Sequence, residues 1–460
     1  DAFNARGELW RKKGERRTGF YGGGASLDPA QNGYASAGSN TSFLINHDVN
    51  ATYNAKISDN LESVTQLGYS VQYQRQHYTL QQGRGLPPFV QTADKATTPI
   101  PGADQRTELS ISGEYIQQNF KYRNQLFLTG AIRVDGSSVF GKDERNQVYT
   151  KLSGSYVLSG TDFWQSAGVA KWWSLLKFRA AYGESGNLTG IPPYGRFNTY
   201  NASAFIGASA FQSAVTYTDP GVKPERQKEL EIGTDMSFLS DRIGLSVNYY
   251  RKKVNDLLIS RAVAGTNGYS FILSNIGTLQ NNGLEVIVNA IPVKTKDFTW
   301  NLTAIYNKNK NEAVNIGQSL ILYNTVGGAP VGIANGEPIG FFYGTFYARD
   351  ANGNIITDAK GIPLTERGKQ TGPLTYEPQR DANGLPLASA PVLNKKIGDP
   401  NPDWTGTLTN DFQYKKLGLH IQIDAVQGVD VFNADYRTRQ GVDNGKIAEK
   451  EDLGILPRGY

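Results

Sequence analysis

The sequence predicts an all-β fold, specifically a transmembrane antiparallel β-barrel of which about twelve strands are present. Three observations support this prediction: long segments alternate between apolar and polar side chains, short and long connections alternate along the chain, and aromatic pairs lie near segment ends. A barrel strand that crosses a bilayer needs about 9–11 alternating residues, whereas strands of soluble proteins average about five or six.

The alternation is most regular in residues 298–306, where every second residue is apolar or aromatic. In residues 109–115, Leu109, Ile111, Gly113 and Tyr115 alternate with Ser110, Ser112 and Glu114, without indicating which set faces lipid. A soluble β-sandwich also alternates, so periodicity alone does not decide between the two architectures. Segment length, connections and aromatic residues favour the barrel.

The connections alternate in the manner of outer-membrane barrels, with tight turns at one end and long loops at the other. The tight turns include residues 240–242 and 415–417; the long loops span about 187–228, 317–336 and 350–399. The aromatic groups are Trp172-Trp173, Tyr249-Tyr250 and Phe341-Phe342-Tyr343, which suit either an interfacial girdle or core packing.

The composition excludes several classes of protein. The chain has no Cys and three His, so disulfides, Cys-based zinc sites and Cys nucleophiles are ruled out. A net charge of +5 over 460 residues argues against nucleic-acid binding. No apolar stretch reaches the roughly 18 residues of a membrane helix. Asp1 opens on polar sequence without a visible signal peptide, so we expect a removed leader or a start inside a longer chain.

Motifs of catalysis and cofactor binding are missing from the sequence. There is no G-x-S-x-G or H-E-x-x-H, and Gly22-Gly23-Gly24 is not followed by Lys-Ser/Thr. We therefore expect no enzyme, no catalytic residue, no metal site and no cofactor. Asp350–Asn354 partly resembles a calcium loop, but its Gly falls at position four, so we interpret it as a turn, like the identical tetrapeptide at 381–384. His420 and Asp424 are interpreted as solvated residues rather than an acid/base pair.

Six motifs occur in a consistent order between about residues 130 and 435, and together they resemble the SusC family of TonB-dependent outer-membrane transporters from Bacteroidota. Val134–Gly141 is similar to the family's Y-D-G-S-S-R-F-G, with Val in place of Tyr and of Arg. The other motifs are Leu176–Gly183 with Ser185–Asn187, Lys228–Phe238 with Tyr249–Leu258, Asn275–Gly277 with Asn282–Glu285, Gly398–Gly406, and Gln427–Asn433.

The resemblance implies an outer-membrane protein in contact with lipid, with twenty-two barrel strands in the family. On this basis residues 1–460 form a partial barrel domain, and the plug domain and the C-terminal strands are absent from this chain. The resemblance also implies two partners, a SusD-like surface lipoprotein on the extracellular mouth and the TonB complex acting through the missing plug. The implied activity is uptake of oligosaccharides or peptides.

On the same basis the long loops contain candidate substrate-binding residues, since aromatic rings stack on sugars and amides hydrogen-bond to sugars or peptides. The candidates are Tyr194, Phe197, Tyr200, Asn201, Tyr323 and Asn324. The alternative is that these side chains only pack on one another.

Three other functions are weighed against uptake: a non-transporting SusC-like structural subunit of an outer-membrane assembly or secretion complex, a passive porin, and a soluble carbohydrate-binding protein. A TonB-contacting segment favours uptake over the structural subunit. Recovery only in detergent would exclude the soluble protein.

Overall fold

A computed structural model describes residues 2–20, 34–87, 90, 92–317, 320–323, 331–441 and 445–454. The chain divides into two compact units. Unit 1 contains Asp1–Gly154, Gly183–Arg226 and Leu258–Asn275; unit 2 contains Ser155–Tyr182, Gln227–Leu257 and Ile276–Tyr460.

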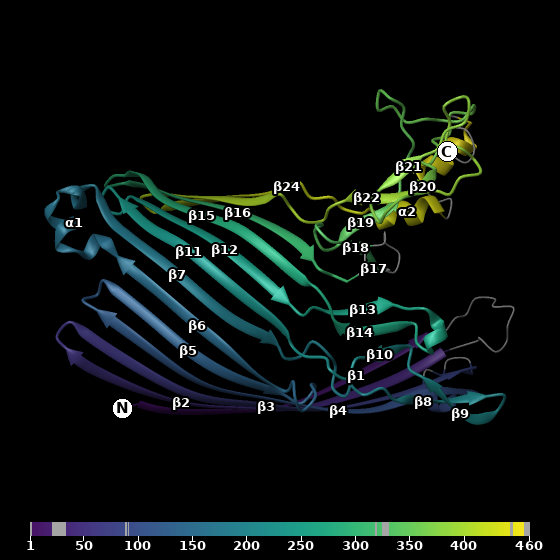
Figure 1. Cartoon of the computed structure of the whole chain (residues 1–460), viewed down its shortest axis with the longest axis horizontal. Coiled ribbons are helices and arrows are strands. Elements are labelled where there is room, and N and C mark those ends of the chain that lie inside the picture. The colour runs from purple at the N-terminus through teal and green to yellow at the C-terminus, as the bar shows by residue number, and fades with distance from the viewer. Residues whose placement is uncertain are drawn as a thin grey trace. The chain divides into compact units, whose positions relative to one another are not determined.

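Thirteen strands form the largest sheet, and their order in the sheet follows their order along the chain (Figure 1). They are β1 (Ala2–Phe20), β2 (Tyr34–Ser58), β3 (Leu61–Arg84), β4 (Thr98–Tyr122), β5 (Leu126–Ser137), β6 (Asn146–Val157), β7 (Trp173–Asn187), β11 (Glu225–Phe238), β12 (Ile243–Asn255), β15 (Thr278–Lys294), β16 (Phe298–Val314), β23 (Trp404–Tyr414) and β24 (Leu417–Gln427). The predicted all-β antiparallel fold is confirmed.

In the part of the chain that the structure describes, the α-helices are short: α1 (Asp162–Ser166), α2 (Ala434–Gly441) and α3 (Lys446–Asp452). None of the helices in the described ranges has the length and apolar character needed to cross a membrane.

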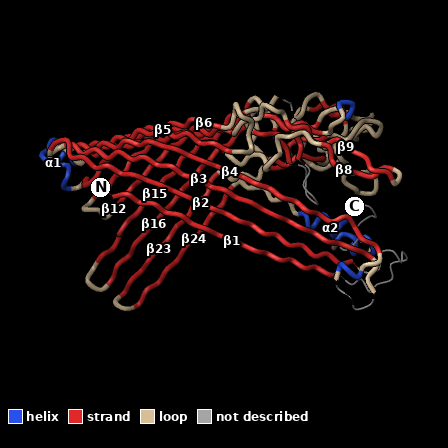
Figure 2. The backbone as a smooth tube through the Cα atoms, turned by 90° about the horizontal axis from the view of Figure 1, so that it is seen from below, coloured by secondary structure: helices blue, strands red, loops and turns tan. Residues whose placement is uncertain are grey.

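Unit 1 contains the longest strands, since β2, β3 and β4 have 25, 24 and 25 residues. They pair antiparallel over nearly their whole length (Figure 2). Tight turns join them at one end. The turn between β4 and β5 places Arg123 and Asn124 at φ +48° and +55°, which suits the right-handed twist of the strands that it joins.

One face of this sheet carries apolar side chains that remain exposed. Leu67, Ile116 and Ile132 form a row across β3, β4 and β5, and they are 52, 49 and 52% exposed. An apolar surface of this extent is unfavourable in water and is suited to lipid. Further members of this apolar face are Tyr53, Ile57, Tyr69, Phe120, Tyr122, Leu128 and Val134.

The opposite face is polar and hydrogen-bonded from strand to strand. Gln117 donates to Gln66 at 2.9 Å, and Thr129 donates to Asn119 at 2.8 Å. Tyr115 lies on this polar face, where its hydroxyl donates to Asn50 at 2.9 Å.

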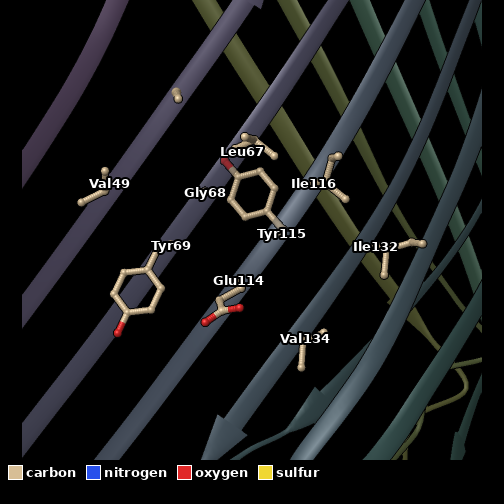
Figure 3. Close-up of a pocket in the computed structure, with 10 residues that line it drawn as sticks. Val49, Leu67, Gly68, Tyr69, Glu114, Tyr115, Ile116, Ile132 and Val134 are labelled. Carbon is tan, nitrogen blue, oxygen red and sulfur yellow. The ribbon is translucent and has the colours of Figure 1, made fainter.

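The predicted alternation of residues 109–115 is confirmed, and the structure adds which face each set occupies. Tyr115 and Gly113 belong to the polar face, and Leu109 packs against a buried cluster of unit 1. Glu114 lies instead in an apolar row between Tyr69 and Val134 (Figure 3). Because Tyr115 and Ile116 are adjacent and both apolar, the sequence does not show which of them faces lipid. The contact of Tyr115 with the neighbouring strand accompanies its place on the polar face.

That contact is the packing of Tyr115 over Gly68. Figure 3 shows the ring beside Gly68 on the neighbouring strand, and a Cβ at Gly68 would lie 2.0 Å from Tyr115 Cε1. Only a residue without a side chain leaves room for the ring in this position. Gly283 and Tyr250 form an equivalent pair in unit 2, where a Cβ would lie 2.2 Å from the ring.

Unit 1 also contains smaller elements that connect its long strands. They are β8 (Tyr200–Phe205) paired with β9 (Ala208–Ser213), and a sheet of β10 (Thr216–Thr218), β14 (Phe271–Asn275) and β13 (Leu258–Ala262). Val139, Phe140, Ile191 and Val222 form a buried apolar cluster next to them. The predicted loop 187–228 is therefore a partly ordered connection; its strands have three to six residues, too few to show a period.

In unit 2, β12, β15, β16, β23 and β24 pair antiparallel, and short turns join β15 to β16 and β23 to β24 (Figure 2). The predicted turn at 240–242 is confirmed: Leu239, Ser240 and Asp241 have φ of +54°, +55° and +65°. Asp241 Oδ1 accepts hydrogen bonds from Ser237 and Ser174 at 2.5 and 2.7 Å, which lower the pKa of its carboxyl group.

The predicted aromatic pair Trp172-Trp173 lies at the start of β7. Trp172 stacks on Phe238 and is 51% exposed, and Trp173 packs edge-on against Trp164 of α1. Both roles left open for the pair are therefore represented, because one ring is exposed and the other contributes to local packing.

The long connection between β16 and β23 contains six short strands. They are β17 (Ile321–Tyr323), β18 (Val331–Ile333), β19 (Phe341–Thr345), β20 (Gly368–Gln370), β21 (Tyr376–Pro378) and β22 (Asn394–Gly398). The predicted loops 317–336 and 350–399 are thus built from local pairings where the structure describes them. Ala348, Ala390 and Leu393 are buried within this connection.

The two Asp-Ala-Asn-Gly segments are turns, as predicted, although only their Gly residues are left-handed, with φ +86° at Gly353 and +77° at Gly384. Asp350 Oδ1 accepts from the backbone of Asn352 and Asn354, and the Asn354 side chain donates to its Oδ2, which lowers the pKa of Asp350. These partners occupy the carboxylate. Within the described ranges no three acidic or His side chains gather as metal ligands.

We expect Gly68→Ala to destabilise the barrel, because the new Cβ would displace the Tyr115 ring and break its hydrogen bond to Asn50. Overpacking of this kind costs about 1–3 kcal/mol. The measurement is the temperature at which the folded band disappears on semi-native electrophoresis. Gly130→Ala is the matched control, because nothing lies within 4 Å of its Cβ position. Equal melting of the two variants would contradict the packing role of Gly68.

We also expect Glu366→Gln to loosen the connection between β16 and β23. Glu366 is 4% exposed and pairs with Arg380, with 2.7 Å between Oε2 and Nη2. Hydrogen bonding to Glu366 raises the pKa of Arg380. Removing one partner of a buried pair costs about 3–5 kcal/mol. Amide hydrogen exchange over residues 345–394 should accelerate, whereas Glu377→Gln, on the exposed side of β21, should leave it unchanged.

Candidate functional site

A hollow of about 390 Å³ on the polar face of unit 1 brings together charged, amide and phenol side chains. The strands β3 to β7 contribute its walls. Its polar lining includes Gln66, Tyr115, Gln117, Arg133, Asp135, Tyr149, Lys151 and Glu184.

Two ion pairs fix the charges of this hollow. Arg133 Nε lies 2.6 Å from Asp135 Oδ1, and Arg133 also donates to Ser70. Arg226, next to the hollow, approaches Glu184 Oε2 to 2.5 Å and donates to the Val148 carbonyl at 2.6 Å. The carboxylates of Asp135 and Glu184 are only 12% and 7% exposed, so each charge depends on its arginine.

Tyr149 is buried between these pairs, at 4% exposure. The Arg226 guanidinium lies 5.5 Å from the centre of its ring. A Cβ at Gly186 would lie 1.8 Å from the Tyr149 hydroxyl, so Gly186 makes room for it. The hydroxyl has no hydrogen-bond partner among the described residues. A buried polar atom of this kind is costly unless a bound group completes it.

The hollow is suited to binding rather than to bond breaking. Its amides, phenols and charges present both donors and acceptors on rigid strands, as a site for a polar ligand requires. The carboxylates of Asp135 and Glu184 are occupied by arginines. Two His side chains contact carboxylates away from this hollow. His77 Nε2 lies 2.8 Å from Asp104 Oδ1, and His420 Nδ1 lies 2.6 Å from Asp411 Oδ1. His420 and Asp411 are exposed, and Asp424 accepts from Thr407.

Four of the six predicted substrate residues lie together in unit 1, around the β8–β9 hairpin. Tyr194, Phe197 and Tyr200 are 51, 49 and 71% exposed, and Asn201 is exposed beside them. These three rings are therefore exposed to solvent. The Arg196 guanidinium lies 4.0 Å from the centre of the Phe197 ring. Tyr323 ends β17 in unit 2, but its side chain and Asn324 lie outside the described residues.

Sequence reasoning missed the residues of the hollow as a site. Asp135 and Glu184 lie inside or next to motifs that carried the family resemblance, which was the available signal. Arg226, the partner of Glu184, is 42 residues from it in sequence, and only strand pairing brings the two together.

Comparison with known proteins agrees with this architecture. The chain is 29% identical over 335 residues to TonB-dependent receptor P3 of Formosa agariphila, covering 71% of this chain and 32% of the relative. It is 27% identical over 320 residues to TonB-dependent receptor SusC of Bacteroides thetaiotaomicron, covering 67% and 30%. The chain thus spans about a third of the length of these curated relatives.

Among solved structures, the RagAB peptide transporter superposes with a TM-score of 0.76 at 17% identity, covering 93% of this chain and 46% of that chain. At this identity the likeness establishes the fold alone. The family model for the TonB dependent receptor-like beta-barrel matches residues 3–445. The chain therefore belongs to the TonB-dependent receptor β-barrel family, whose members are outer-membrane proteins.

Proposed function

We propose that this chain forms the barrel part of a TonB-dependent transporter that imports oligosaccharides or peptides together with a SusD-like surface lipoprotein. The observation that carries the proposal is the two-sided sheet of unit 1, with an exposed apolar face for lipid and an opposite face that bears a charged hollow. On this proposal the polar face lines the interior of the barrel.

The proposal assigns different tasks to the two kinds of site. The exposed rings of Tyr194, Phe197 and Tyr200, with Asn201, make the first contact with cargo. Tyr323 and Asn324 remain predicted members of this group. The hollow around Tyr149 contacts either the cargo or a plug domain, which the proposal places in a part of the receptor outside these 460 residues. TonB acts through that plug.

Uptake by cells that express the complete receptor and its lipoprotein tests this function. We expect a fluorescent oligosaccharide or peptide cargo to accumulate in the periplasm, and accumulation to stop when a protonophore abolishes the inner-membrane gradient. Uptake that continues without the gradient would indicate a passive pore. If no cargo enters under either condition and an outer-membrane complex fails to assemble without the chain, the protein is a structural subunit instead.

Tyr149→Phe separates the hollow's binding role from its structural role. Because the hydroxyl has no partner among the described residues, its removal should change barrel stability by less than about 0.5 kcal/mol. A hydrogen bond to cargo or plug is worth about 0.5–1.5 kcal/mol, so uptake should fall by about 2- to 10-fold. Tyr69→Phe, on the apolar face, is the control and should transport normally. Normal uptake by Tyr149→Phe would show that its hydroxyl lies outside the transport path.

A further inference from the structure

A second hollow, of about 550 Å³, lies within unit 2 on the connection between β16 and β23. It shares no lining residue with the hollow around Tyr149, and it is formed where β19 ends and β22 begins. Its lining includes Thr345, Tyr347, Arg349, Thr365, Lys395 and Ile397. Three cationic side chains and no carboxylate line it, counting Lys396 with Arg349 and Lys395.

Lys396 is neutralised by its neighbours. Its Nζ lies 3.0 Å from Glu337 Oε2 and 3.3 Å from Asp399 Oδ2. Burial opposes the charge of Lys396, but these two hydrogen-bonded carboxylates outweigh it and raise the pKa of the ammonium group. Lys396 is therefore a structural cation, and its charge is not available to a ligand.

Lys395 and Arg349 differ from Lys396, because no carboxylate of the described residues forms an ion pair with either. Lys395 Nζ lies 4.2 Å from the centre of the Phe346 ring, which holds the ammonium without neutralising it. Arg349 donates to the carbonyl oxygen of Gly353 at 2.6 Å, which leaves its positive charge uncompensated. Two positive charges thus face one hollow without a matching anion.

The same hollow offers an open aromatic ring. Tyr347 is 51% exposed, and the neighbouring Phe346 is held by Tyr376, with 5.1 Å between ring centres. Thr345 and Thr365 add hydroxyl groups to the lining. An exposed ring beside hydroxyl donors and acceptors suits a sugar ring, which has one face of C–H groups and a rim of hydroxyls.

The backbone under these side chains is ordered before any ligand binds. Tyr347 is bridged to Thr365, and the buried Ala348 receives and donates backbone hydrogen bonds with Ile356 and Leu364, at 2.9 and 2.8 Å. A rigid floor lowers the entropy lost on binding.

We infer that this hollow is a binding site for an acidic saccharide, whose carboxylate or sulfate groups pair with Lys395 and Arg349 while a sugar ring lies on Tyr347. The inference rests on the proposed transport function and narrows its cargo to anionic glycans. An acidic peptide would pair with the two cations but would leave the exposed Tyr347 ring without a contact. An acidic saccharide would contact both the cations and the ring.

The inference is tested by measuring binding to the full-length receptor in detergent with titration calorimetry. The probes are a hexagalacturonate, a sulfated hexasaccharide, the neutral maltohexaose and a hexaglutamate peptide. We expect at least one of the two acidic saccharides to bind about 10-fold or more tightly than maltohexaose, and its affinity to fall as salt is added. Tighter binding of the hexagalacturonate identifies carboxylate as the recognised group, and tighter binding of the sulfated hexasaccharide identifies sulfate.

Lys395→Gln and Arg349→Gln should each weaken binding of that saccharide by about 10-fold or more, because each removes a charge-assisted hydrogen bond to the anion. The matched control is Lys360→Gln, an exposed cation at a turn of the same connection. Tyr347→Ala should weaken binding of the saccharide and leave the affinity for hexaglutamate unchanged. Semi-native electrophoresis verifies that each variant is folded.

Three results would overturn the inference: neither acidic saccharide binds, the two cation variants bind like the wild-type protein, or hexaglutamate binds as tightly and Tyr347→Ala has no effect. The assay needs neither TonB nor a proton gradient. Binding without uptake would therefore leave the site intact and refute only the transport function, whereas uptake without binding would refute only the site.

Discussion

The structure depends on one constraint, which is that backbone amides and carbonyls surrounded by apolar material must be paired with each other. The long antiparallel ladders of β2, β3 and β4 meet it residue by residue across some two dozen positions. Once the backbone is satisfied in this way, side chains are free to differ between the two faces. An exposed apolar row such as Leu67, Ile116 and Ile132 then becomes compatible with a stable fold, because lipid can cover it.

The contacts that hold the polar face depend on the same ladder. Strand neighbours lie about 4.7–4.9 Å apart, so a large side chain can cross its neighbour only where that neighbour lacks a side chain. Gly68 beneath Tyr115 and Gly186 beneath Tyr149 provide this space. Gly113 provides space in the same way for the Arg133–Asp135 pair, since a Cβ at Gly113 would lie 2.1 Å from Arg133 Nη2. Packing and charge are therefore coupled through the positions of a few glycines.

The fold could be predicted from the sequence, because the alternation of apolar and polar residues is a local property and long strands repeat it many times. The turn at Asp241 and the two Asp-Ala-Asn-Gly turns were also predictable, since turn chemistry depends on adjacent residues. The face of Tyr115 was not, because Ile116 beside it satisfies the opposite phase equally well. The pair Arg226–Glu184 and the short strands within the long connections depend on non-local pairing, which leaves no periodic signal in a single sequence. The exposed Tyr194, Phe197 and Tyr200 were found by residue type, and their accessibility is what the structure adds.

On the two proposals above, the hollows separate general from specific recognition within one chain. The residues of the hollow around Tyr149 stand on sheet strands, where the buried carboxylates of Asp135 and Glu184 must be neutralised by Arg133 and Arg226 because an unpaired buried charge is costly. The connection between β16 and β23 is under less constraint. There Lys396 is neutralised, while Lys395 and Arg349 retain free charge because solvent reaches them. A connection can therefore vary its charge without disturbing the ladder, and it is the part of such a protein where selectivity for the charge of a cargo can arise at least cost to the fold.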